Sequence, residues 1–96
     1  MNRITYKQIM TIMAHYNKKG LPYRAKQVKR LIRLFEDIFE HESYLHQKIE
    51  GIGYRQLTGY FRRHSAESLK TRKEKYQILR VFFAYADIKV RVPIQH

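Results

Sequence analysis

The sequence of 96 residues is 44% hydrophobic and 14% aromatic, which suits one small domain with a single modest core and argues against global disorder. Lysine and arginine number 20 against 8 aspartates and glutamates, so the formal net charge is +12, an excess typical of proteins that meet a polyanion. The absence of cysteine excludes disulfides and thiolate metal sites, and no apolar run approaches the ~20 residues that span a bilayer. We therefore expect a cytoplasmic protein that contacts no membrane.

Apolar residues recur with a helical period in four stretches, and no stretch sustains the alternation of a strand. The first helix is predicted over about 5–17, because Thr5 and Gln8 have the spacing of a capping box. Gly20 is the candidate for a left-handed residue that closes this helix. The second helix is predicted over 22–41, where a proline suits the first turn and a regular apolar stripe follows.

The second half of the chain predicts two more helices. After a loop or a short extra turn, the glycines of 49–53 predict a tight turn. A third helix is expected over 54–64, and Gly59 inside it implies the close approach of another helix, since glycine costs about 1 kcal/mol in a helix interior. Ser68 is a good N-cap for a fourth helix over 69–86.

These elements together predict an all-α fold, a compact bundle of four to five helices. We expect a single domain over residues 1–96, in which 88–96 form a C-terminal tail or linker that alternates briefly and contains a proline.

Both long helices carry their cations near their N-termini, where the helix dipole is already positive. Each such charge costs roughly 0.3–1 kcal/mol at low salt, so helix stability alone does not favour this order. A phosphate backbone that supplies the missing negative charge would explain it, and an ordinary solvated face is the alternative. The basic residues concerned are Arg24, Lys26, Lys29, Arg30 and Arg33 in the second helix, and Lys70, Arg72, Lys73 and Lys75 in the fourth.

The segment Ile49-Glu50-Gly51-Ile52-Gly53 resembles the hairpin of the helix-hairpin-helix DNA-binding motif. In that motif two glycines let the backbone approach a phosphate, which the free N–H groups of the following helix then hold. The resemblance makes Gly51 and Gly53 candidate DNA-binding residues. It departs from the family at Leu57, where a small residue is usual, and a tight turn without a ligand is the alternative.

A longer resemblance covers about 23–93. Ser68-Leu69-Lys70-Thr71-Arg72, then Leu79-Arg80-Val81-Phe82-Phe83-Ala84-Tyr85, then Pro93, is similar to the N-terminal SAM-like core-binding domain of tyrosine recombinases, the phage integrases. This resemblance implies a SAM-domain-like bundle that forms one half of a clamp around double-stranded DNA. Its partners would be the DNA and either a recombinase catalytic domain or another protein subunit.

Carried over position by position, the resemblance assigns DNA contacts to the same cations that the charge pattern indicates. Arginines and lysines would hold phosphates, while Gln27, Thr71 or Arg72 would reach base edges. The recombinase active-site residues are absent from this sequence. The chain is therefore expected to be the non-catalytic half of a site-specific recombinase or integrase, or a stand-alone relative that serves a mobile element.

Other chemistry is not indicated. His41 and His46 do not make up the three or four ligands of a zinc site, so we expect no metal, no cofactor, no small-molecule substrate and no enzymatic activity. Ordinary ion pairs are expected between Arg33 and Asp37, and between Arg80 and a carboxylate of the same domain. Two other functions stay open: a protein-interaction module that docks an acidic partner, and RNA binding through exposed tyrosines.

Overall fold

The computed structural model describes residues 1–96 and contains four α-helices, two short 3-10 helices and no strand. The α-helices are α1 (Arg3–Ile12), α2 (Pro22–His41), α3 (Tyr54–Arg63) and α4 (Leu69–Ala86), and the 3-10 helices η1 (Ser43–Leu45) and η2 (Ile49–Gly51) lie between α2 and α3. The predicted all-α bundle is confirmed, with a radius of gyration of 12.7 Å. None of the helices combines the length and the apolar character that a membrane crossing requires.

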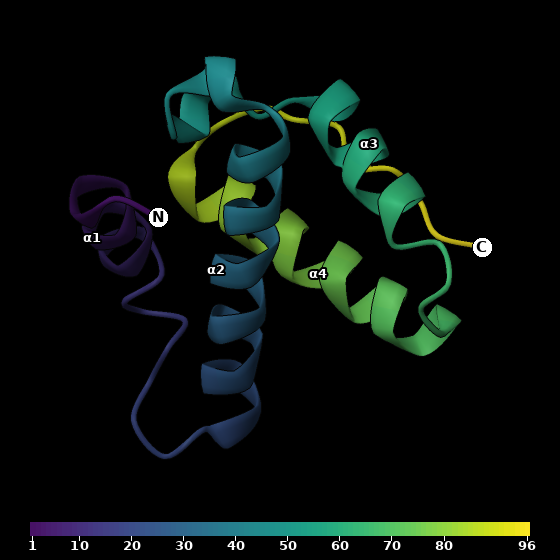
Figure 1. Cartoon of the computed structure of the whole chain (residues 1–96). Helices are drawn as coiled ribbons and strands as arrows, with labels where there is room; N and C mark the ends of the chain where they lie inside the picture. The colour runs from purple at the N-terminus through teal and green to yellow at the C-terminus, as the bar shows by residue number, and fades with distance from the viewer.

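Helix α2 is the central element, and α3 and α4 both pack against it (Figure 1). Its apolar stripe faces the equally apolar interior side of α4. Phe35 of α2 meets Phe82 of α4 edge to face, with ring centroids 5.0 Å apart, and Leu31 and Leu79 are fully buried beside them. This aromatic contact helps to hold the two long helices together.

The bounds predicted for α2 and α4 are confirmed at both ends, and α3 ends one residue earlier than predicted. Ser68 caps α4, since its hydroxyl accepts a hydrogen bond from the N–H of Thr71 at 3.2 Å. In α3, His64 is the residue after the last helical one. Local capping signals therefore located these helices well.

The prediction for α1 is wrong at both ends. The helix starts two residues earlier because Asn2, not Thr5, is its N-cap: the Asn2 side chain accepts from the N–H of Thr5 at 2.8 Å. It ends at Ile12, so that Gly20, although left-handed with φ +87°, lies in the connection to α2 and does not close the helix.

The close helix packing expected at Gly59 is also absent. A Cβ atom at this position would meet only Nη1 of Arg63, at 3.4 Å. No neighbouring helix packs against α3 at Gly59.

Residues 88–96 form neither helix nor strand, as expected of a tail, but part of the segment lies on the core. Val92 is only 8% exposed and joins the hydrophobic cluster, and Ile88 and Val90 pack against that cluster. The tail runs from the end of α4 past α3 (Figure 1).

Candidate nucleic-acid interface

Two adjoining hollows lie along α2 and the N-terminal half of α4. The first hollow has α2 on one side and α4 with the α3–α4 turn on the other; the second lies beside it, at the start of α4. Their lining residues are, for the first, Lys26, Lys29, Arg30, Arg33, Asp37, Tyr60, His64, Glu67, Thr71 and Lys75, and, for the second, Tyr23, Leu69, Lys70, Lys73, Glu74 and Gln77. We refer to these two hollows together as the α2–α4 face. The two hollows meet where Arg30, which lines the first, contacts Glu74, which lines the second.

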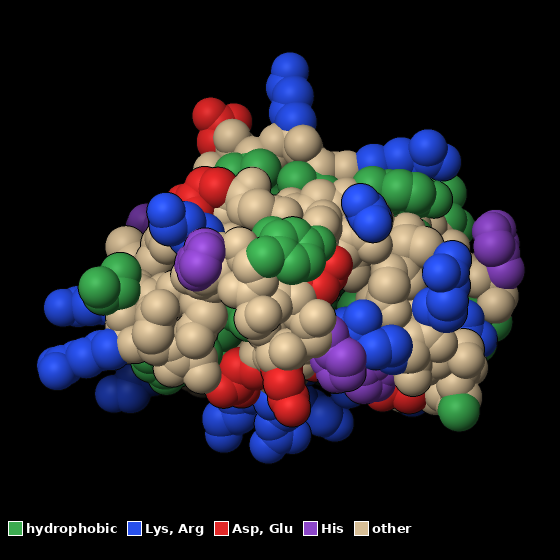
Figure 2. Space-filling model, turned by 45° about the horizontal axis from the view of Figure 1, so that its top comes forward, with side chains coloured by type: hydrophobic (Ala, Val, Ile, Leu, Met, Phe, Trp, Pro, Cys, Tyr) green, Lys and Arg blue, Asp and Glu red, His purple; other side chains and the backbone are tan.

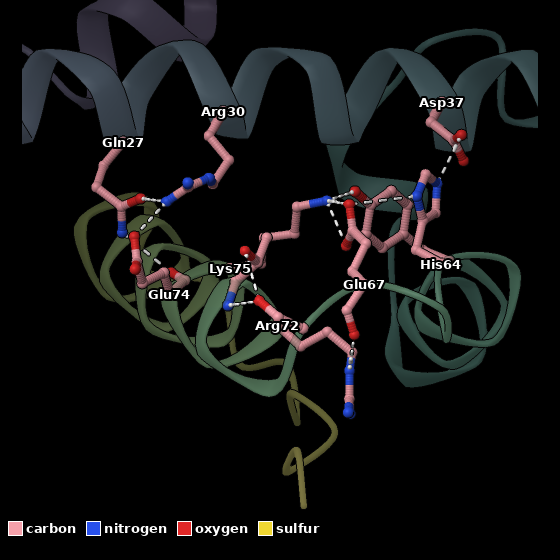
Figure 3. A network of polar contacts seen from close by, with 11 residues as sticks. Gln27, Arg30, Asp37, His64, Glu67, Arg72, Glu74 and Lys75 are labelled. Atoms are coloured by element: carbon pink, nitrogen blue, oxygen red, sulfur yellow. Dashed lines mark hydrogen bonds and ion pairs between the residues drawn. The ribbon is translucent and has the colours of Figure 1, made fainter.

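A polar bridge joins α2 to α4 at the border of the two hollows (Figure 3). Arg30 pairs with Glu74 across the helices, Nη1 to Oε2, at 2.7 Å, and this hydrogen bond is the main cause that lowers the pKa of Glu74. Gln27 donates from Nε2 to the Glu74 backbone carbonyl at 3.0 Å and accepts a hydrogen bond from Arg30. Gln27 is only 2% exposed, so its amide serves this bridge and does not project toward a ligand.

Lys75 forms a second bridge, which ties α4 to α3 and to the turn between them. Its Nζ lies 2.8 Å from both carboxylate oxygens of Glu67 and donates to the Tyr60 hydroxyl at 2.6 Å. Burial is the main cause that raises the pKa of Tyr60. Since Lys75 is 7% exposed and fully partnered, it stabilises the floor of the first hollow.

Asp37 anchors the far end of the first hollow. It accepts from Arg63 at 2.6 Å and lies 3.0 Å from Nε2 of His64, whose ring stacks on Tyr60 at 4.1 Å between centroids. Desolvation alone would raise the pKa of Asp37, but the hydrogen bonds from Arg63 and His64 outweigh it and lower that pKa. The predicted pair between Arg33 and Asp37 is therefore wrong, because Asp37 turns toward the end of α3.

Arg72 and Arg24 are directed elsewhere. Arg72 points away from α2 (Figure 3), and it donates to the Glu67 carbonyl at 3.2 Å and to Gln95 at 3.3 Å. The guanidinium of Arg24 lies 4.9 Å from the ring centroid of Tyr16. Neither residue lines the two hollows.

The remaining predicted cations of the face are exposed and have no partner in the protein. None of their side chains makes an ion pair or a hydrogen bond to another residue. The unpartnered cations are Lys26, Lys29 and Arg33 on α2, and Lys70 and Lys73 on α4.

Thr71 lines the first hollow and is half-buried, with its hydroxyl accepting a hydrogen bond from Ser68 at 3.0 Å.

Positive charge also occurs outside the α2–α4 face. Figure 2 shows lysine and arginine side chains projecting at several places around the view that it presents, with acidic side chains in fewer places. Arg80, for which an ion pair was predicted, makes none, and its guanidinium lies 5.8 Å from the ring centroid of Tyr76. The α2–α4 face is thus distinguished by convergence of two helices and not by charge alone.

The two glycines of the hairpin-like turn lie outside both hollows. A Cβ on Gly51 would come within 2.8 Å of Cδ2 of Leu45, so this glycine leaves room for η1 to fold back. Gly53 is the extended N-cap residue of α3, and its N–H donates to Oε1 of Gln56 at 2.9 Å. Local structure thus accounts for both glycines: Gly51 makes room for Leu45, and Gly53 caps α3.

Sequence reasoning missed the acidic and aromatic partners on this face. Glu74 is 44 residues away from Arg30, and Glu67 is eight residues before Lys75 across a turn, so no helical spacing indicates either pair. The only signal was the isolation of Glu74 among the cations of α4. Because these acids are already paired, they leave the outer cations without partners.

No protein-family model, curated protein or solved structure matches this chain, so its functional assignment depends on the residues and geometry described above.

Proposed function

We propose that the α2–α4 face binds double-stranded DNA, chiefly through its phosphates. The observation that carries this proposal is the set of five unpartnered cations that two helices bring to adjoining hollows. The acids of the same face are paired with Arg30, Lys75, Arg63 and His64, so none of them forms an ion pair with that set. A surface of this kind is stabilised when phosphates supply the missing charge.

The spacing along α2 supports a backbone contact. Lys26, Lys29 and Arg33 follow one another at three and four residues, and therefore lie along one side of the helix. At about 1.5 Å per residue they cover ~10 Å, a length over which one DNA strand presents about three phosphates at ~3.4 Å each along the axis. Lys70 and Lys73 add a second row on α4.

The paired residues act on this surface by holding it in shape. Arg30 and Gln27 fix the separation of α2 and α4, and Lys75 fixes the turn before α4. We place Thr71, the half-buried hydroxyl between the two rows, as the candidate for a base contact. The proposal follows the resemblance to a recombinase core-binding domain, in which this chain would bind DNA and leave catalysis to another domain.

The test is the salt dependence of duplex binding. Five phosphate contacts give a slope of about −4.5 for log affinity against log salt, or a loss of ~500-fold between about 50 and 200 mM. The double variant K29A/R33A removes two contacts, so its slope should fall to about −2.7 and its loss over the same range to ~40-fold. Fluorescence anisotropy with a labelled duplex measures both.

The matched control is K18A/K19A, which changes the net charge equally at two exposed lysines that line neither hollow. Its slope should equal that of the unaltered chain. Equal slopes for all three proteins, or an affinity that hardly changes with salt, would contradict the proposal. A structured RNA that displaces the duplex at equal concentration would assign the face to RNA instead.

A further inference from the structure

The backbone of residues 89–92, which follow α4, has no hydrogen-bond partner in the fold. The last backbone bond joins the N–H of Ile88 to the carbonyl of Phe83 at 3.0 Å, and residues 89–96 make no backbone–backbone hydrogen bond. After α4 the chain continues as a segment without regular secondary structure, which runs along the bundle (Figure 1). Unpaired N–H and C=O groups in such a stretch are a template for another chain.

The side chains of this segment alternate as in a β-strand. Ile88, Val90 and Val92 pack against the core, whereas Lys89 and Arg91 between them are exposed. A period of two with one face buried is the pattern of a strand on a core. Residues 88–92 thus have the side-chain arrangement of a strand but lack a neighbouring strand.

A hollow runs beside this segment and offers space for a neighbour. Its floor and walls come from the outer side of α4 and from the tail itself. Tyr76, Arg80 and Ala84 line it from α4, and the tail contributes from Ile88 to Val92 and then Ile94. Pro93 has no N–H, so pairing would end there.

The charges around the hollow indicate which kind of strand would pair with residues 88–92. Asp87 is the only acid lining the hollow, and neither it nor the cations Arg80, Lys89 and Arg91 form an ion pair. A second copy paired antiparallel about Val90 would set Lys89 directly opposite the Arg91 of that copy, which is destabilising. A strand with acidic residues at the matching positions would instead be attracted.

We propose that residues 88–92 bind an extended acidic segment of a partner protein, which adds to them as a second β-strand. Backbone hydrogen bonds would supply affinity, and the acids opposite Lys89 and Arg91 would supply specificity. This surface is separate from the α2–α4 face, since the two share no lining residue. The two proposals can therefore fail independently.

The probe is a short fluorescent peptide in which glutamates alternate with valines, and its binding is followed by anisotropy at low salt. The charge reversal K89E/R91E turns two attractive cross-strand contacts into repulsive ones and should weaken binding about tenfold or more. A peptide with lysine in place of glutamate should show the opposite preference and bind the variant better than the unaltered chain. The variant K18E/K19E, with the same change in net charge at exposed sites outside the hollow, should bind the acidic peptide nearly as well as the unaltered chain.

N-methylation separates strand pairing from simple attraction of charges. Methylating one alternate set of peptide amides should abolish binding, while methylating the other set should leave it intact, because only one edge of a strand faces its neighbour. Similar binding by both methylated peptides, or equal affinity of the unaltered chain and K89E/R91E for the acidic peptide, would overturn the proposal. So would sedimentation showing a dimer that K89E/R91E disrupts, because a second copy would then occupy the segment.

Discussion

Replacing Lys75 by methionine isolates the bridge beneath the first hollow. Methionine keeps most of the apolar length of the lysine side chain, so packing changes little while the ammonium is lost. The ammonium contacts both oxygens of Glu67 at 2.8 Å and the Tyr60 hydroxyl at 2.6 Å. We expect Lys75→Met to lower the free energy of unfolding by about 2 kcal/mol.

The magnitude follows from the burial of the two partners. A hydrogen bond to a charged group contributes about 1.5–3 kcal/mol, and removing one member of a fully buried pair costs about 3–5 kcal/mol. The Glu67 side chain is 30% exposed, against 9% for Lys75, so water can restore part of the solvation of the carboxylate. The range for a hydrogen bond to a charged group therefore applies. For a domain of this size a loss of about 2 kcal/mol corresponds to a fall in Tm of roughly 8–16 °C.

Urea denaturation followed by the helical circular dichroism signal measures this change, and a double-mutant cycle with Glu67→Gln tests its cause. If the pair carries the effect, Lys75→Met should cost much less in the Glu67→Gln background. A loss below about 0.5 kcal/mol, or an equal loss in both backgrounds, would refute the reasoning. The slope of duplex binding against salt should stay unchanged in Lys75→Met, because this lysine is not counted among the phosphate contacts.

Gly59→Ala should stabilise the protein by about 0.5–1 kcal/mol in the same urea assay, because alanine favours the helix and the new Cβ meets only Nη1 of Arg63; a destabilised variant would show that α3 needs the glycine. Asp37→Asn should lower stability by on the order of 1 kcal/mol at about pH 6, and by progressively less as the pH falls below the ordinary pKa of 3.8. Its folded pKa lies below the ordinary value of 3.8, so the stabilisation by Asp37 is complete above that value and is lost as the pH falls through the lowered pKa. Urea midpoints of the two proteins that fail to converge in acid would contradict this assignment.

The elements most accurately predicted are those with local signals. Ser68 before an apolar period located α4, and a proline followed by a regular stripe located α2, because caps and periodicity depend only on neighbours in the chain. At the start of α1 the capping-box spacing of Thr5 and Gln8 predicted the wrong N-cap, because the Asn2 side chain caps the helix. The tertiary contact from the Thr5 hydroxyl to the Gln47 carbonyl, at 2.7 Å, involves a residue that no local pattern connects to α1.

The sequence by itself determined that the chain forms a helical bundle and that its cations gather at the beginnings of two helices. Only the tertiary structure decided which of those cations remain available. Arg30 and Lys75 look like their neighbours in the sequence, yet each meets an acid that lies across a helix crossing or a turn. The reason is physical: a helical period tells which side of a helix a residue occupies, but the angle and register at which α2 crosses α4 depend on tertiary packing such as that of Phe35 against Phe82.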